Sequence, residues 1–265
     1  MTNALAQLLD ALWRDYVATT PQAERIHRLL SERGESVRND HVALRTYNLP
    51  GIGIAELARP FEALGWELQP DRYRFPDKKL VARYWRHPDP GLPKVFISEL
   101  CVEELSAGGS QIVQQLVSQV PAGYALLPWS GRPWTVRRAE YESLLLESEY
   151  AAWVAAFGFR VNHFTVAVNA LTTFPDLPSL NAFLTDHGFA LNQAGGAIKG
   201  TPAQLLEQSS TLADTIVVDL AGEAVRIPSC YYEFARRYAR PDGELFQGFV
   251  PASADKIFEA TDVRR

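Results

Sequence analysis

The first forty residues carry apolar side chains at the spacing of two amphipathic helices. In the first helix, apolar positions recur every three or four residues, at Leu5, Leu8, Leu9, Leu12 and Tyr16. In the second, which follows Pro21, the apolar positions are Ile26, Leu29 and Leu30. Side chains at this spacing lie along one face of an α-helix, so the pattern predicts two helices, each with one apolar face.

From His41 onward the pattern changes to short apolar runs separated by turns. A strand at His41 and a turn at Pro50-Gly51 are followed by a helix over residues 54–64 and extended segments at 66–68, 80–86 and 95–100. A comparable order begins at His163, with a helix near 180–187 and extended segments at 215–220, 224–227 and 230–234. We therefore predict two diverged copies of one strand–helix–strands unit.

Further helices are predicted between and after these two units. Residues 109–120 and 138–157 have helical patterns and are joined by a loop that contains residues 127–134. Residues 253–261 resemble a short final helix, for which Ser253 is a candidate N-cap. Residues 195–201 read GGAIKGT and lack the strand–loop–helix setting of a nucleotide-binding loop, so we expect a flexible loop there.

The composition is that of an ordinary globular protein. Of the 265 residues, 47% are hydrophobic and 22% are charged, and the net charge of -5 argues against a surface for nucleic acid or anionic membranes. No apolar run approaches the ~20 residues that a membrane span needs, and the N-terminus has no secretory pattern, so we predict a cytoplasmic protein. Cys101 and Cys230 lack CxxC spacing and are expected to be buried.

Two of the predicted strands begin with a histidine, and a third contains a carboxylate. The three fragments are Asp40-His41-Val42-Ala43, Val161-Asn162-His163-Phe164 and Tyr231-Tyr232-Glu233-Phe234. Two imidazoles and one carboxylate from different strands are the parts of a facial metal triad, which leaves coordination positions open. The sequence thus suggests a metal site made by His41, His163 and Glu233.

An arginine shares the first histidine's face of its strand. Because side chains alternate along a strand, His41, Ala43 and Arg45 point the same way, and four residues at ~3.3 Å each separate His41 from Arg45 by about 13 Å. The small Ala43 leaves room between them. A guanidinium pairs with a carboxylate through two parallel hydrogen bonds, so Arg45 and a metal on His41 could hold the two ends of a short dicarboxylate. By the same alternation, His163 shares a face with Thr165, and Glu233 with Tyr231.

Each of these residues also has a purely structural interpretation. A lone strand histidine is often only hydrogen-bonded, Glu233 could face solvent, and Arg45 could form a structural salt bridge. The coincidence of two histidine strands and one carboxylate strand favours the metal site. Glu99 closes the first unit much as Glu233 closes the second, so it is a candidate fourth ligand for Zn or Ni, or else a hydrogen-bond acceptor or salt-bridge partner.

As an ordered set, fragments along most of the chain resemble the iron-dependent 2-oxoadipate dioxygenase/decarboxylase family, which is related to the vicinal-oxygen-chelate folds. They are residues 40–46 (DHVALRT), 94–100 (KVFISEL), 162–165 (NHFT), 198–201 (IKGT), 205–211 (LLEQSST), 231–237 (YYEFARR), 246–249 (FQGF) and 254–259 (ADKIFE). The resemblance implies that His41, His163 and Glu233 bind Fe(II) and that Arg45 holds the substrate's carboxylate.

The resemblance also implies a reaction in which 2-oxoadipate and O2 give 2-hydroxyglutarate and CO2. Polar candidates for the pocket wall are Lys199, Gln208, Ser209, Ser210 and Ser253. Characterised members of the family are considerably longer, so the iron site could be kept while the substrate differs. The alternatives are a Zn- or Ni-dependent lyase, isomerase or hydrolase that also uses Glu99, and a non-catalytic module that binds a small anion.

The expected fold is α+β, with two vicinal-oxygen-chelate-like β modules that form a metal-centred cleft, and with N-terminal and intervening helices. In a single catalytic domain, a helical N-terminal segment (1–40) precedes the first β module (41–100). A helical connection (101–158), the second β module (159–240) and a tail (241–265) follow. The expected partners are a small 2-oxo acid and O2, with no nucleic acid and no membrane; the pattern makes no prediction of oligomeric state.

Overall fold

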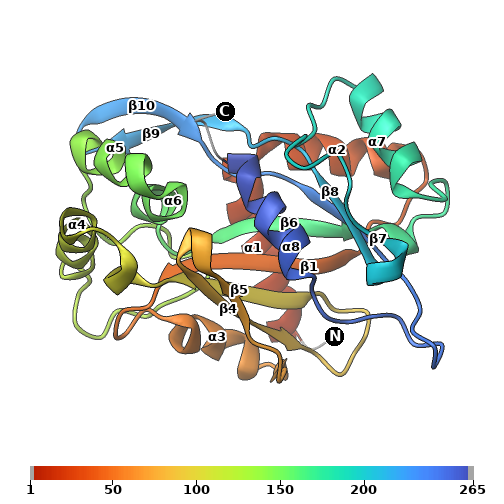
Figure 1. Ribbon diagram of the computed structural model, residues 1–265, viewed down its shortest axis with the longest axis horizontal. Helices are drawn as coiled ribbons and strands as arrows, with labels where there is room; N and C mark the ends of the chain where they lie inside the picture. Colours follow the sequence, from red (N-terminus) through yellow and green to blue (C-terminus); the bar gives the residue numbers. More distant parts are fainter. Residues whose placement is uncertain (1–2, 262–265) are drawn as a thin grey trace.

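One mixed β-sheet forms the centre of the molecule (Figure 1). The structure is a computed structural model that describes residues 3–261. Eight strands are hydrogen-bonded in the order β2-β4-β5-β1-β6-β11-β8-β7, and β3 pairs with β4. The strands of the first half are β1 Asn39–Tyr47, β2 Glu67–Leu68, β3 Tyr73–Phe75, β4 Leu80–Arg86 and β5 Lys94–Leu100. Those of the second half are β6 Val161–Ala167, β7 Lys199–Thr201, β8 Leu206–Ser210 and β11 Glu233–Arg237.

The two halves of the sheet have the same internal order. In the first half β1 pairs in parallel with β5, and β5 pairs antiparallel with β4. In the second half β6 pairs in parallel with β11, and β11 pairs antiparallel with β8. The two halves meet where β1 and β6 pair antiparallel. An internal repeat is present, as predicted, with the two histidine strands side by side at its centre, but its second copy is completed by β8 and β7 rather than by the strands predicted at 215–220 and 224–227.

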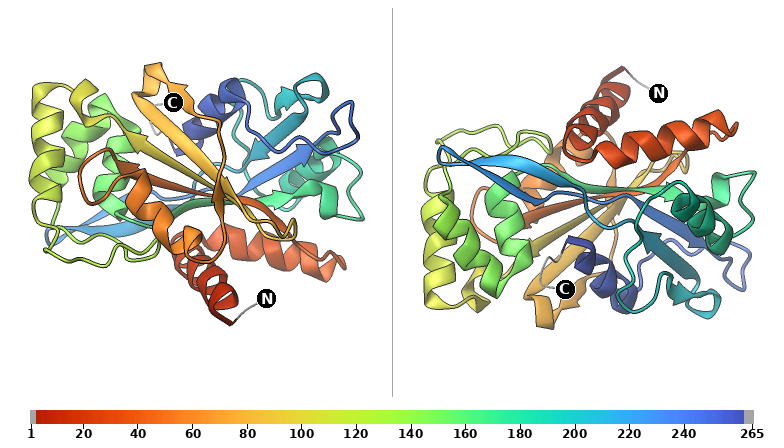
Figure 2. Two further views of the ribbon diagram at one scale, coloured as in Figure 1. Left: turned by 90° about the horizontal axis from the view of Figure 1, so that it is seen from below. Right: turned by 90° about the horizontal axis from the view of Figure 1, so that it is seen from above.

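Helices cover both faces and one end of the sheet (Figure 2). Their bounds are α1 Asn3–Thr19, α2 Pro21–Glu32, α3 Ile54–Glu62, α4 Ala107–Val117, α5 Arg138–Glu147, α6 Glu149–Phe157, α7 Leu177–Asp186 and α8 Pro251–Ile257. The views from above and below show α1 and α2 on one face and α8 on the other, with α4 to α6 at one end. No helix in residues 3–261 has both the length and the apolar character to cross a membrane.

The two N-terminal helices form as the sequence predicts. Leu5, Leu8, Leu12 and Tyr16 of α1 are buried, whereas the polar positions between them are more exposed. Tyr16 also donates a hydrogen bond to the carbonyl of Tyr231 at 2.5 Å. Burying one large apolar side chain contributes about 1.5–3 kcal/mol, so this stripe is sufficient to hold α1 against the sheet.

The second half of the sheet differs from the sequence prediction in two places. Residues 199–201 and 206–210 form β7 and β8, although the first was expected to be a flexible loop and the second has no apolar alternation. The predicted strands at 215–220 and 224–227 do form, as β9 Thr215–Leu220 and β10 Glu223–Pro228, but they pair only with each other. The polar β8 fits into the sheet because Gln208 donates a hydrogen bond to Glu233 on one face and Ser209 donates one to Asn181 on the other.

The helical connection and the C-terminal helix also differ in detail. The predicted helix over 138–157 is broken at Ser148, whose hydroxyl accepts a hydrogen bond from the backbone of Ala151 and caps α6. At the end of α6, Gly158 adopts a φ of +69°, and an added Cβ would lie 2.2 Å from the Gly131 carbonyl. The final helix begins at Pro251 with Val250 as its N-cap, so the expected capping role of Ser253 is wrong.

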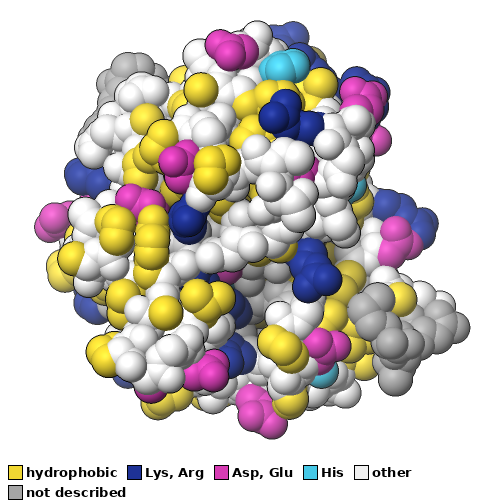
Figure 3. Space-filling model, turned by 90° about the vertical axis from the view of Figure 1, so that its right-hand side faces the viewer, with side chains coloured by type: hydrophobic (Ala, Val, Ile, Leu, Met, Phe, Trp, Pro, Cys, Tyr) yellow, Lys and Arg dark blue, Asp and Glu magenta, His cyan; other side chains and the backbone are white. Residues whose placement is uncertain are grey.

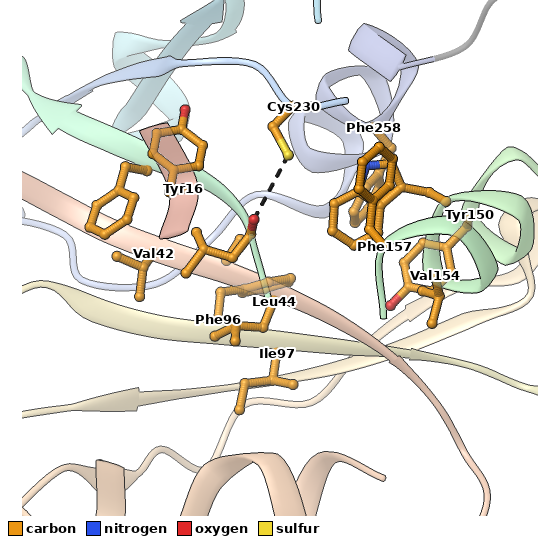
Figure 4. Packing of buried hydrophobic residues seen from close by; sticks show 14 of the residues in the cluster. Tyr16, Val42, Leu44, Phe96, Ile97, Tyr150, Val154, Phe157, Cys230 and Phe258 are labelled. Atoms are coloured by element: carbon orange, nitrogen blue, oxygen red, sulfur yellow. Dashed lines mark hydrogen bonds between the residues drawn. The ribbon is translucent and has the colours of Figure 1, made fainter. Parts of the chain in front are cut away.

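The hydrophobic core joins the sheet to the helices around it (Figure 4). The side chains labelled there include Tyr16 of α1, Val42 of β1, Phe96 of β5, Val154 of α6 and Phe258 after α8. Cys230 is fully buried and its thiol lies 3.8 Å from the carbonyl of Val161. Because close packing fixes β1, β6 and their neighbours, the side chains on the opposite face of these strands are held in fixed positions.

Candidate metal centre

Strand register brings the three predicted ligands to one face of the sheet. His41 on β1 is paired with Thr165 on β6, and Thr165 is paired with Glu233 on β11. Directly paired residues point to the same face, so these three side chains form a row across three strands. His163 precedes Thr165 by two positions and therefore shares this face.

The ligand atoms of the three side chains are close enough to share one ion. Nε2 of His163 lies 3.2 Å from Oε2 of Glu233, and Nε2 of His41 lies 3.7 Å from Oε1. The two imidazole rings are nearly perpendicular, at 82°, with centroids 5.6 Å apart. All three residues are at most 5% exposed. Imidazole and carboxylate ligands bind transition metals at about 2.0–2.2 Å, so an ion placed between these atoms could reach all three.

Each imidazole is oriented by the residue that precedes it. Nδ1 of His41 lies 2.8 Å from Oδ1 of Asp40, and Nδ1 of His163 lies 3.0 Å from Oδ1 of Asn162. An oxygen acceptor at Nδ1 places the ring proton there and leaves Nε2 as the acceptor and metal-binding atom; Nε2 of His41 lies 3.0 Å from the hydroxyl of Thr165. The sequence pairs Asp-His and Asn-His thus supply both the ligands and the groups that orient them.

A buried ion pair holds the carboxylate behind His41. Arg237 donates from Nε and Nη2 to the two carboxylate oxygens of Asp40, at 2.6 and 2.8 Å, and Nζ of Lys94 lies 3.8 Å away. Burial by itself would raise the pKa of Asp40, but the charges of Arg237 and Lys94 hold it well below its usual range. The carboxylate is therefore ionised and acts as a fixed acceptor for His41.

The protonation states of the other ligands suit a divalent cation. Burial raises the pKa of Glu233, but its interactions with His163 and His41 and a hydrogen bond from Gln208 at 2.5 Å lower it overall. Burial lowers the pKa of His163 by more than the nearby Glu233 raises it. An ionised carboxylate and a neutral imidazole are the forms that bind metals.

The three side chains face a small cavity that the C-terminal segment closes. Its apolar wall consists of Phe96 of β5, Phe249 before α8, Ala254 and Ile257 of α8, and Phe258 after it. The free space inside is ≈ 20 Å³, which is room for about one water molecule. The metal-binding face is thus largely shielded from solvent by aromatic and aliphatic side chains.

Arg45 lines the same cavity at the far end of β1, on the face that strand alternation predicts. Its guanidinium donates from Nη1 to Oε1 of Glu149 at 2.9 Å and from Nη2 to the hydroxyl of Thr261 at 3.3 Å. Its charge also lies over the ring of Tyr150, 4.9 Å from the centroid. Nε is buried and has no hydrogen-bond partner in the described part of the chain. The arginine is therefore held firmly, and its Nε is the guanidinium nitrogen without a partner among the described residues.

Several other polar atoms around the cavity are buried without a hydrogen-bond partner among residues 3–261. They are Oε1 of Gln208, Oγ of Ser210, the hydroxyl of Tyr231 and Oε2 of Glu233. The ring of Tyr231 stacks on His163 with centroids 4.7 Å apart. Buried polar groups without partners are rare in folded proteins, so a cluster of them indicates a ligand site. Strand alternation predicts that Tyr231 shares a face with Glu233, but no sequence pattern predicts that its hydroxyl is buried without a partner among these residues.

The remaining sequence candidates for the pocket wall lie in different places. Lys199 pairs with Gln208 in the sheet and so lies beside the site; burial lowers its pKa to about 8, although Glu233 and Glu259 raise it. Ser209 points to the opposite face, where its hydroxyl donates to Asn181 of α7 at 2.8 Å, so its expected place in the pocket is wrong. Ser253 is buried, but the triad cavity is lined by its neighbour Ala254.

Glu99 does not join the three ligands. In the internal repeat, residue 96 and not residue 99 is equivalent to Glu233. Residue 96 pairs with Ala43, two residues after His41, just as Glu233 pairs with Thr165, two residues after His163. Glu99 lies three residues further along β5, and an odd offset turns a strand side chain to the other face. There its carboxylate accepts a hydrogen bond from the backbone of Ile54, the first residue of α3, at 2.9 Å. The expectation of a fourth ligand is corrected, whereas the alternative of a hydrogen-bond acceptor agrees with the structure.

Two repeated strand–helix–strands units, joined edge to edge, bring buried His, His and Glu side chains together, which is the arrangement of a candidate metal site in an α+β fold. Comparison with known proteins identifies the family. The family model of 2-oxoadipate dioxygenase/decarboxylase matches residues 2–122 and 118–244. A rice protein, the chloroplastic/amyloplastic 2-oxoadipate dioxygenase/decarboxylase, is 34% identical over 93% of this chain and 75% of its own length. The chain belongs to the 2-oxoadipate dioxygenase/decarboxylase family.

Solved structures show the same fold. Rice hydroxyglutarate synthase, crystallised in complex with 2-oxoadipate, superposes with a TM-score of 0.93 at 32% identity over 99% of this chain and 94% of that one. A Shewanella frigidimarina protein with a provisional hydrolase name gives a TM-score of 0.89 at 48% identity, over 95% and 99% of the two chains. A Ralstonia eutropha protein of the glyoxalase superfamily, at 23% identity and a TM-score of 0.74 over 91% and 84%, shares the fold.

Proposed function

We propose that this enzyme uses Fe(II) to convert 2-oxoadipate and O2 into 2-hydroxyglutarate and CO2. The observation that carries the proposal is the convergence of His41, His163 and Glu233 in the cavity that also contains Arg45. The equation balances without an external reductant, because both oxygen atoms and all the carbon of the substrate are found in the two products. The relatives named for this activity, and the rice structure that contains 2-oxoadipate, support the assignment.

His41, His163 and Glu233 would hold the iron. Fe(II) bound by two imidazoles and one carboxylate keeps adjacent positions open, where it supplies the electrons and binding sites for the reaction of dioxygen with a 2-oxo acid. The orphaned Oε2 of Glu233 and the lone pair of His163 Nε2 are 3.2 Å apart and face the same point. Such a donor set fits a divalent transition metal.

Arg45 would receive the carboxylate at the far end of the substrate. Its Nε donor is buried and unused, while Nη1 is held by Glu149 and Nη2 by Thr261. A guanidinium binds a carboxylate well along one edge, and burial strengthens the pairing because water does not compete. With this end fixed, the 2-oxo acid group is directed toward the triad and the distal carboxylate is kept away from the metal.

Residues in and next to the cavity would orient the substrate and exclude water. The hydroxyls of Tyr231, which stacks on His163, and Ser210, which pairs with Glu233, have no partner within residues 3–261 and could donate to substrate oxygens. Phe96, Phe249 and Phe258 form the apolar wall that keeps solvent from a reactive centre. Because ≈ 20 Å³ of free space is far too little for a six-carbon acid, α8 and the turn after it would have to move for the substrate to enter.

An oxygen-uptake assay on anaerobically prepared, iron-loaded protein tests this function. We expect 2-oxoadipate to consume O2 and release CO2 in equal amounts, and 2-oxohexanoate, which lacks the distal carboxylate, to react poorly. Arg45→Met should raise the KM for 2-oxoadipate at least tenfold without changing iron content, because a charge-assisted hydrogen bond contributes about 1.5–3 kcal/mol. Absence of O2 uptake with every 2-oxo acid would contradict the proposal.

A further inference from the structure

A second cavity opens at the end of the sheet where β1 begins. It has a volume of ≈ 380 Å³, which is the size of sites for small metabolites. Its walls come from the start of β1, the end of β4, the start of β5 and the loop at residues 244–247. Figure 3 faces this end of the molecule and shows a hollow bordered by Lys and Arg side chains. None of its lining residues lines the triad cavity.

Cationic side chains predominate around this second cavity. They are Arg38, Arg86, Lys94 and Arg237, and they are opposed by the carboxylates of Asp40 and Glu244. His87 also lines the wall, but its Nδ1 accepts a hydrogen bond from the backbone of Asp89 and so carries no proton there. The whole chain has a net charge of -5, so this excess of positive charge is a local feature.

Three of these cations remain available for a ligand. Arg237 is already committed, because it binds both oxygens of Asp40 and the carbonyls of Phe246 and Gly248. Arg38 and Arg86, in contrast, make no side-chain hydrogen bond or ion pair with any residue in the range 3–261. Within the described part of the chain, the ammonium group of Lys94 forms an ion pair only with the carboxylate of Asp40, at 3.8 Å, and the Lys94 side chain is 12% exposed.

The electrostatic surroundings of Lys94 favour an added anion. Burial lowers the pKa of Lys94 to about 8. The charge of Asp40 raises this pKa, whereas the charges of Arg237 and Arg86 lower it further. The ammonium group of Lys94 lies in a recess beside the guanidinium groups of Arg86 and Arg237. The carboxylate of Asp40, which Arg237 already binds, does not balance these three positive charges. A negative group between Lys94 and Arg86 would be attracted by both and would meet little competition from solvent.

We propose that this second cavity binds a small anion with at least two negative charges, held between Arg86 and Lys94 with Arg38 at the rim. Carboxylate and phosphate compounds share the required chemistry. The recessed shape favours a compact ligand over a nucleic acid, which needs an extended basic surface. Asp40 belongs to this cavity's wall and also orients His41, so the anion site and the metal centre share one buried side chain.

Isothermal titration of the full chain with two probes, inorganic phosphate and glutarate, tests this proposal. Ionic strength is held constant, because screening alone changes the binding of anions. We expect at least one probe to bind with a Kd below about 1 mM. Arg86→Gln and Lys94→Met should each weaken that binding tenfold or more. Arg83→Gln is the matched control: Arg83 lies on the same strand as Arg86, three residues away and outside the cavity, and should change the Kd less than twofold.

The two probes separate the sources of the ligand. Binding of phosphate alone would assign the cavity to a phosphorylated compound, and binding of glutarate alone to a dicarboxylate. Binding of both would assign it to the shared chemistry. Glutarate bound at Arg45 instead would be unaffected by Arg86→Gln and Lys94→Met, and that result would overturn the proposal. Absence of binding by both probes to the wild-type chain would overturn it as well, whether or not the protein oxidises 2-oxoadipate.

Discussion

Substitution of Asp40 by Asn should weaken metal binding without abolishing it. Asparagine has the same shape as aspartate, and its side-chain oxygen can still accept the hydrogen bond from Nδ1 of His41. In the wild-type chain this nitrogen lies 2.8 Å from Oδ1 of Asp40. The other ligand imidazole, on His163, is already oriented by an amide, that of Asn162. The variant would therefore give both imidazoles the same kind of partner. Loss of a carboxylate behind a ligand histidine costs 10–100-fold in metal affinity, and we expect about tenfold here.

The same substitution should cost stability for a different reason. Asp40 accepts two hydrogen bonds from Arg237, and both side chains are buried. Removing one partner of a buried ion pair costs about 3–5 kcal/mol, because the other charge is left uncompensated. We expect a value near 3 kcal/mol, since Arg237 keeps its bonds to the carbonyls of Phe246 and Gly248. Adding Arg237→Met in a double variant should recover part of this stability but none of the metal affinity.

Two measurements separate these effects. Anaerobic titration with Co(II), followed by its visible absorption, gives the metal affinity, and urea unfolding of the metal-free protein gives the stability. The reasoning would be refuted if Asp40→Asn bound Co(II) within twofold of the wild type while losing stability as expected. The ion pair would then support the fold without orienting His41.

Three further predictions follow from other buried polar groups. Glu149→Gln removes the negative charge that lies 2.9 Å from Arg45, so the KM for 2-oxoadipate should fall several-fold while that for 2-oxohexanoate is unchanged. Tyr231→Phe removes an unpaired buried hydroxyl, so urea unfolding should show equal or slightly higher stability, whereas the KM for 2-oxoadipate should rise. Glu35→Gln should cost about 1–3 kcal/mol near pH 7, and the difference from the wild type should vanish in acid.

The pH dependence of the last prediction follows from the contacts of Glu35. Burial raises its pKa, but hydrogen bonds from the hydroxyl and backbone of Thr173 and Thr172 lower it overall, below the usual 4.5. A lowered pKa means that the stabilisation is complete above the unfolded-state value and is lost as the pH falls through the folded-state value. Urea unfolding at a series of pH values measures this loss.

Each of these three predictions can fail in its own way. A KM for 2-oxoadipate that rises in Glu149→Gln would show that Glu149 serves to hold Arg45 rather than to neutralise it. A clear loss of stability in Tyr231→Phe would mean that the hydroxyl has a partner in the folded protein. A destabilisation by Glu35→Gln that is the same at pH 4 and pH 7 would show that the charge of Glu35 does not contribute.

Much of the metal centre could be predicted from the sequence because it depends on local alternation. A strand places every second residue on one face, so the neighbours of His41 and His163 follow from the sequence alone. Glu99 was misplaced because its position depends on the register between β1 and β5, which is set by long-range pairing. Glu99 lies three residues beyond the position equivalent to Glu233, so its carboxylate binds the backbone at the start of α3 and does not face the other ligands.

Contacts between distant segments could not be predicted in this way. Arg237 lies 197 positions from Asp40, and Glu149 lies 104 positions from Arg45. Apolar alternation does not predict β8, because its sequence LEQSS is mostly polar. Its polar side chains are accommodated because Gln208 faces Glu233 while Ser209 is hydrogen-bonded on the opposite face.

The central claim is that His41, His163 and Glu233 together hold one catalytic iron. Anaerobic Fe(II) titration, with O2 uptake on 2-oxoadipate measured on the same samples, tests it most directly. We predict one tightly bound iron per wild-type chain. Alanine at any of the three positions should lower the affinity at least about a hundredfold and abolish O2 uptake, because each supplies one of three protein ligands. The matched control His187→Ala, at the exposed end of α7, should behave as the wild type. Wild-type iron affinity and O2 uptake in any of the three alanine variants would contradict the account.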